Sequence, residues 1–164
     1  MRKLKFISIM SELGAGTRGA SLGLDALKVA SLNANSSFFK QFPFEEVETE
    51  NELLFDENPT PNGKNISGIA RLYTRTANKV AEDLSTGFFP VIVSGDHSCA
   101  GGTIAGIKKA FPNKRLGVVW IDAHADLHSP FTTPSGNVHG MPLATAIADD
   151  NKEHAINSPN EETE

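Results

Sequence analysis

The chain has 164 residues, a length typical of one domain, and 39% of them are apolar, which favours a globular protein over a disordered one. Its 15 Lys and Arg against 20 Asp and Glu give a net charge of −5, which argues against a nucleic-acid partner. No apolar run approaches the roughly 18 residues of a membrane span, the first residues lack a signal-like apolar stretch, and there is one cysteine, Cys99. We therefore expect a cytoplasmic protein without membrane contacts.

The hydrophobic pattern predicts strands and helices that alternate along the chain. In chain order, we expect a strand over 4–10, a loop over 14–19, a helix over 22–32, a short strand near 47, a helix over 66–84, a strand over 88–94, a helix over 103–111 and a strand over 116–121. The longer strands are apolar on both faces, which is typical of a parallel sheet covered by helices on two sides. The sequence thus predicts an α/β fold.

The charge pattern divides the chain at residue 148. Residues 149–164 hold six carboxylates and one lysine, which together make up the whole net charge, and Ile156 is their one large apolar residue. Such a segment buries too little surface to offset the entropy lost on ordering. We expect one domain over 1–148 and an acidic, disordered tail over 149–164.

Polar residues follow two of the predicted strands. His97 comes shortly after the strand at 88–94, and Asp122, His124 and Asp126 form an Asp-x-His-x-Asp run after the next strand. Ligands of open parallel sheets bind outside the carboxyl ends of the strands, and strands joined by one crossover are often neighbours. Carboxylate oxygens with imidazole nitrogens suit Mn²⁺, Zn²⁺ or Fe²⁺. The pattern favours a metal site over a purely structural role as caps at strand ends.

Three motifs resemble those of the arginase, or ureohydrolase, family: Ser-Gly-Asp-His-Ser at 94–98, Asp-Ala-His-Ala-Asp at 122–126 and Ser-Gly-Asn-Val-His-Gly-Met-Pro at 135–142. The loop at 14–23 is also similar to the first strand-loop-helix of that family. The resemblance covers residues 1–148, about the N-terminal half of a family member. It implies a three-layer α/β/α fold with a mainly parallel sheet, truncated before the C-terminal half.

The resemblance also implies a centre of two Mn²⁺ ions and hydrolysis of the guanidinium group of L-arginine to L-ornithine and urea. His97, Asp122 and Asp126 resemble the ligands of one metal, and His124 with the shared Asp122 those of the other. His139 resembles the histidine that shuttles protons in that family. The neutral-range titration of histidine suits such a role.

The loop before His139 resembles the part of the family that holds the amino-acid end of the substrate. Thr133, Ser135 and Asn137 take these positions and favour arginase over agmatinase, whose substrate lacks a carboxylate. His128 stands where arginases usually have an asparagine, so it is a further candidate substrate residue and leaves the guanidino substrate open.

The remaining metal ligands of the family come from an Asp-x-Asp motif in its C-terminal half, and no such motif occurs after residue 142. We therefore expect one Mn²⁺ at most and impaired turnover. An unpaired sheet edge is also expected, and it favours homo-oligomers.

Two alternatives stay open at this point. The first is a half-domain that keeps a metal site without catalysis. The second is a dinucleotide-binding domain, because Gly14, Gly16 and Gly19 fit G-x-G-x-x-G, although no acidic residue ends a well-defined second strand. Cys99 is expected to be a small buried residue rather than a nucleophile.

Overall fold

Strand β1 (Lys3–Ile9) is the centre of a three-stranded parallel sheet, in the order β2-β1-β3. The computed structural model describes residues 3–58 and 60–159. Strand β2 (Phe44–Glu46) pairs with one edge of β1, and β3 (Phe88–Ser94) pairs with the other over seven residues. Parallel pairing places the carboxyl ends of β1 and β3 side by side.

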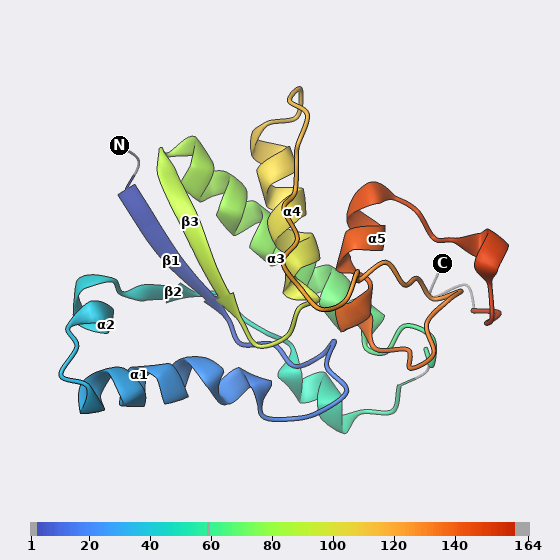
Figure 1. The fold of residues 1–164 in the computed structure, drawn as a ribbon, viewed down its shortest axis with the longest axis horizontal. Helices are drawn as coiled ribbons and strands as arrows, with labels where there is room; N and C mark the ends of the chain where they lie inside the picture. Colours follow the sequence, from blue (N-terminus) through green and yellow to red (C-terminus); the bar gives the residue numbers. More distant parts are fainter. Residues whose placement is uncertain (1–2, 59, 160–164) are drawn as a thin grey trace.

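Helices cover both faces of this sheet (Figure 1). Ile7 and Ile9 of β1 point to one face, where they form a core with residues of α3 (Ile66–Ser85) and α4 (Cys99–Ala110). Phe6 points to the opposite face and packs against Phe38 of α2 (Phe38–Gln41) and against Phe42, the residue after that helix. Helix α2 follows α1 (Gly23–Asn33). The result is a three-layer α/β/α arrangement.

The remaining elements are short helices in the segments that connect the strands and the longer helices. They are η1 (Ala20–Leu22), η2 (Asn51–Phe55), η3 (Val138–Gly140), α5 (Pro142–Ile147) and η4 (Lys152–His154). None of the helices in the described ranges combines the length and the apolar character needed to cross a bilayer.

Most of the predicted elements are confirmed. The strands at 4–10 and 88–94 are β1 and β3, the helix at 22–32 is η1 with α1, and the helix at 66–84 is α3. The strand expected near 47 is β2, which ends one residue earlier.

Helix α4 begins four residues before its predicted start because its glycines serve packing. An added Cβ would lie 2.4 Å from the Tyr73 hydroxyl at Gly101 and 2.7 Å from the Val80 Cβ at Gly106. These glycines therefore let α4 approach α3 closely, which outweighs their poor helix propensity.

The strand predicted over 116–121 is wrong. Within the described structure the segment has no regular secondary structure and no place in the sheet, and none of its backbone N–H groups is bonded to β3. Val119 and Ile121 are 87% and 93% exposed. An apolar, β-branched run forms a strand when a neighbouring edge accepts its hydrogen bonds, and here the segment runs past α4 instead (Figure 1).

The first part of the predicted tail contacts the domain. The Ser129 hydroxyl donates to the carbonyl oxygen of Asp150, and the Phe131 carbonyl accepts the N–H groups of Ile156 and Asn157 at 2.8 and 3.0 Å. Residues 160–164 lie outside the described residues. The division of the chain at residue 148 stays a prediction.

An ion pair between a largely buried carboxylate, Glu50, and two partly exposed arginines joins the loop after β2 to α3. Arg71 donates to Glu50 through Nε and Nη2 at 2.8 and 2.6 Å, and Arg75 Nη2 lies 2.7 Å from the other carboxylate oxygen. The Arg71 guanidinium, with a smaller contribution from Arg75, lowers the pKa of the Glu50 carboxyl to about 2. The pair therefore stabilises the folded chain in its charged form.

We expect Glu50→Gln to lower the free energy of unfolding by about 1–3 kcal/mol near neutral pH, because the charged hydrogen bonds are lost. The folded pKa lies below the unfolded value of about 4.3, so this stabilisation is complete above that value and is lost as the pH falls through about 2. Urea unfolding of both proteins near neutral pH and near pH ~3 measures the difference, which should narrow in acid.

Glu52→Gln is the matched control, because Glu52 is exposed in the adjoining η2 and its substitution should change the free energy of unfolding by less than about 0.5 kcal/mol. A Glu50→Gln protein as stable as the wild type at both pH values would contradict the role of the pair.

Candidate metal and substrate site

The turn that follows β3 carries the first candidate ligand. Gly95 extends the ladder, since its N–H donates to the Ile9 carbonyl oxygen at 2.9 Å. An added Cβ at Gly95 would lie 2.3 Å from the Ser11 carbonyl oxygen, so this close approach of the two strand ends requires glycine. His97 therefore emerges at the carboxyl edge, next to the loop that follows β1.

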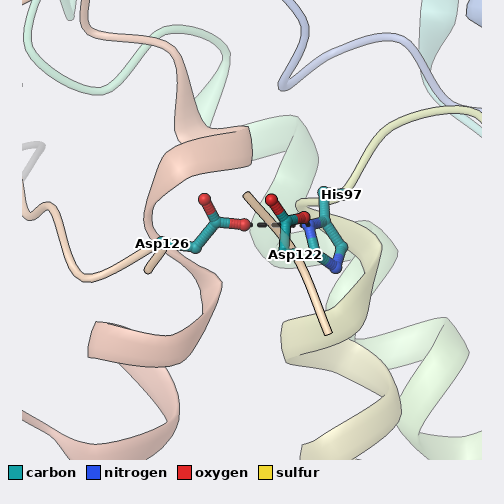
Figure 2. Close-up of side chains that lie close together, drawn as sticks. All are labelled: His97, Asp122 and Asp126. Atoms are coloured by element: carbon teal, nitrogen blue, oxygen red, sulfur yellow. Dashed lines mark ion pairs between the residues drawn. The ribbon is translucent and has the colours of Figure 1, made fainter. Parts of the chain in front are cut away.

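Three side chains from different parts of the chain meet at this edge. His97 Nδ1 lies 2.8 Å from Asp126 Oδ2 and 3.0 Å from Asp122 Oδ2, and one ligand atom of each residue lies within 4.8 Å of the others. Figure 2 shows the three side chains pointing toward one another. One imidazole nitrogen and two carboxylates are a donor set that divalent ions such as Mn²⁺ and Zn²⁺ accept.

The backbone around the two aspartates holds their carboxylates in place. Asp126 has a φ of 50°, and its carbonyl oxygen accepts the N–H groups of Leu143 and Ala144 in α5 at 3.1 and 3.3 Å. The His124 N–H donates to Asp122 Oδ1 at 2.8 Å and is the main cause that holds the pKa of that carboxyl below its usual range. The backbone of Asp126 and the carboxylate of Asp122 are thus each held in place.

Trp120 supports the histidine from the side. Its ring stacks on the His97 imidazole with 4.5 Å between ring centroids and 18° between ring planes. The sequence offered no signal for this contact, because Trp120 belongs to the segment predicted as a strand.

His124 lies beside the three-residue group rather than in it. Its side chain is 83% exposed, and its Nδ1 lies 3.3 Å from Asp122 Oδ1. The predicted role of His124 in a second metal site stays a prediction.

The candidate substrate residues surround one cavity next to Asp126. The cavity has a volume of about 420 Å³, and its walls are the segment around Asp126 and the loop that leads to η3. The candidate residues among those that line it are His124, Asp126, His128, Thr133, Ser135, Asn137 and His139. The structure therefore brings together every residue that the sequence placed at the substrate, beside one of the candidate ligands.

Hydrogen bonds order the loop that forms the cavity wall. The Thr133 hydroxyl accepts the Gly136 N–H at 3.0 Å, and the Gly136 carbonyl accepts the Lys64 N–H at 2.8 Å. His128 is held from both ends, since its N–H donates to the Gly140 carbonyl at 3.0 Å and its Nδ1 lies 3.3 Å from the Thr132 hydroxyl. Thr133 is 3% exposed and shapes the wall, whereas Ser135 and Asn137 offer polar atoms to a ligand.

The structure also bears on the competing interpretations. The backbone of Gly14, the first glycine of the G-x-G-x-x-G run, is bonded to Asp96 and His139, so it faces the protein's own side chains. Cys99 is 1% exposed, and burial raises the pKa of its thiol, which disfavours a thiolate nucleophile.

The fold and the site define an α/β protein with a candidate metal group at the carboxyl edge of a parallel sheet. The sequence model of the Arginase family matches residues 3–157. The arginase of Brevibacillus brevis is 36% identical over 157 residues, which are 89% of this chain and 48% of that protein.

Solved structures agree with this match. The arginase of Entamoeba histolytica in complex with L-ornithine superposes with a TM-score of 0.75 and 28% identity, over 93% of this chain and 52% of that one. The arginase of Bacillus caldovelox gives a TM-score of 0.69 and 33% identity, over 88% and 48%. The chain belongs to the arginase family, and it spans about half the length of the curated relatives it matches.

We expect the chain to bind one Mn²⁺, because His97 Nδ1 and one carboxylate oxygen of each of Asp122 and Asp126 already lie close enough together to share an ion. Isothermal titration with Mn²⁺ measures the affinity and the number of ions bound. His97→Ala should weaken binding by 10-fold or more, whereas His154→Ala, which changes an exposed histidine of η4, should leave it unchanged. Equal affinity in wild type and His97→Ala would show that the ion binds elsewhere.

Proposed function

We propose that the chain carries the catalytic residues of a manganese-dependent arginase, which hydrolyses the guanidinium group of L-arginine to L-ornithine and urea. The observation that carries this proposal is the cavity that joins Asp126 of the metal group to His139 and to the polar loop at 133–137. The relative from Entamoeba histolytica was solved in complex with L-ornithine, the product of this reaction.

The proposed metal residues are His97, Asp122 and Asp126, with His124 as a weaker ligand beside them. Mn²⁺ is borderline in softness and accepts their nitrogen and oxygen donors together. When bound, the metal supplies Lewis acidity, which makes a hydroxide nucleophile available near neutral pH. The two carboxylates offset the charge of the ion in a partly buried setting, and Asp126 does so most strongly, since its side chain is 6% exposed.

The loop before η3 is proposed to bind the amino-acid end of the substrate. Ser135 and Asn137 present hydroxyl and amide groups to the cavity, and His128 faces the same space. The carboxylate of an amino acid can accept hydrogen bonds from such groups, and its ammonium group can donate hydrogen bonds to them. These contacts would hold the guanidinium end toward Asp126 and thereby favour arginine over agmatine, which lacks the carboxylate.

His139 is proposed to move the proton that the reaction requires. Hydrolysis breaks the bond between the guanidinium carbon and the nitrogen that stays on ornithine, and this nitrogen leaves as an amine that needs a proton. The Nδ1 of His139 lies 2.7 Å from the Gly14 carbonyl oxygen, so its Nε2 is the nitrogen left for proton transfer.

A metal-binding half-domain without turnover is the second candidate function. It is favoured by the ligand count, because the described residues gather one group of three metal-binding side chains and leave His124 largely exposed. Both candidates share the metal site, and urea release separates them.

We expect slow release of urea from L-arginine with Mn²⁺, and less from agmatine. His139→Asn should lower the rate by about 10²-fold or more while Mn²⁺ stoichiometry stays unchanged, because the proton carrier is lost and the ligands remain. Asp126→Asn should lower both quantities, since it removes a charged ligand. A colorimetric urea assay with metal analysis of the same samples measures them, with His154→Asn as the control.

Two results would count against the catalytic proposal. Absence of urea above the metal-only background would favour the half-domain. A rate of urea release in His139→Asn equal to that of the wild type would show that His139 does not transfer the proton.

A further inference from the structure

The loop after β1 connects the metal-binding turn to His139 through a single residue, Gly14. The Gly14 carbonyl oxygen accepts two hydrogen bonds from His139, one from its backbone N–H at 3.1 Å and one from its ring Nδ1 at 2.7 Å. A carbonyl oxygen is an acceptor only, so this contact requires the ring proton on Nδ1. The second nitrogen, Nε2, then carries the lone pair of the neutral ring.

The position of Gly14 is in turn set by Asp96. The Gly14 N–H donates to Asp96 Oδ2 at 3.1 Å, and the Ser98 N–H donates to Asp96 Oδ1 at 2.8 Å. Asp96 is 7% exposed and directly precedes His97 in the chain. Its carboxylate thus joins the loop after β1 to the turn after β3.

Residue 14 must be glycine for this contact to form. An added Cβ would lie 2.6 Å from Asp96 Oδ1 and 2.7 Å from the Ser98 Cβ, closer than such atoms approach in proteins. The Gly14 backbone can reach the buried carboxylate because it carries no side chain.

The rest of the loop is anchored at both ends, so Gly14 has a defined position. Glu12 Oε1 accepts the N–H groups of Gly19 and Ser21 at 2.9 and 2.8 Å. The Asn65 side-chain amide donates to the Leu13 carbonyl at 3.0 Å. Because the loop is anchored in this way, a shift of Asp96 would move the Gly14 carbonyl oxygen and with it the hydrogen bond to His139.

We propose that Asp96 is a positioning residue that acts through Gly14 to hold His139 in the Nδ1–H tautomer, with Nε2 free for proton transfer. This inference rests on the proposed function for the role of His139, but the tautomer is a property of the chain by itself. Asp96 acts on the orientation and proton arrangement of the ring and need not touch the substrate.

Asp96→Asn tests the inference with almost no change of shape. The amide has one acceptor oxygen, so either Gly14 or Ser98 faces an NH₂ group instead of an acceptor. Asp83→Asn is the matched control, since Asp83 is a buried aspartate that contacts Lys5 and Lys79 in the opposite part of the fold. Gly14→Ala is a second test that displaces the same contact by steric overlap.

The measurement is a long-range ¹H–¹⁵N correlation spectrum of the labelled chain, at a pH of about 8 where histidine rings are neutral. His139→Gln assigns the ring signals. We expect wild type and Asp83→Asn to show Nδ1–H alone. Asp96→Asn and Gly14→Ala should lose this single form and show a signal from Nε2–H.

A wild-type ring with the proton on Nε2 would overturn the inference. An unchanged Nδ1–H tautomer in both Asp96→Asn and Gly14→Ala would do the same, and either folded variant suffices for the comparison. Failure of the chain to release urea would instead contradict the proposed function, because the spectrum requires neither metal nor turnover.

Discussion

The parallel pairing of β1 with β3 is the constraint on which the rest of the structure depends. Seven residues of each strand are in register, and the ladder continues to Gly95 beyond the end of β3. The loops after both strands therefore begin at the same edge of the sheet, a few ångströms apart. Ile7 and Ile9 pack this pair against α3 and α4 in a buried core, so the edge of the sheet is held by buried apolar contacts.

Hydrogen bonds and packing contacts join the segments of the candidate site to that edge. Asp96 connects the two loops, and His97 stands next to it. The segment that follows α4 returns to the edge with Asp122 and Asp126, although it does not join the sheet. The loop before η3 then packs on the first loop, since His139 bonds to Gly14 and an added Cβ at Gly16 would lie 2.6 Å from the Asn137 amide. Metal-binding and substrate-facing residues thus share one support.

The sequence predicted the elements that depend on the local hydrophobic pattern. Its predictions were wrong for the elements that depend on contacts between distant parts of the chain. The apolar repeat of α3 and the apolar runs of β1 and β3 gave the right elements. His97 lies beyond the end of β3, as the strand-end rule predicts, and it meets Asp122 and Asp126 as expected, although the segment before these aspartates is not a strand. The run at 116–121 was predicted as a strand because its residues favour one, but sheet membership depends on a partner edge, which no local pattern encodes. The early start of α4 was missed because its glycines serve close packing against Tyr73 and Val80. Asp96 and Trp120 could not be recognised as supports of the site, since their roles arise from contacts across the fold.

We propose that His97, Asp122 and Asp126 form the metal site of this arginase-family chain. Crystals grown with Mn²⁺ and measured at the manganese absorption edge would locate the ion directly by anomalous scattering. We expect an anomalous peak within bonding distance of His97 Nδ1 and of one carboxylate oxygen of each aspartate. A peak at another group of carboxylates, such as Asp149 and Asp150, with none at His97, Asp122 and Asp126, would contradict it.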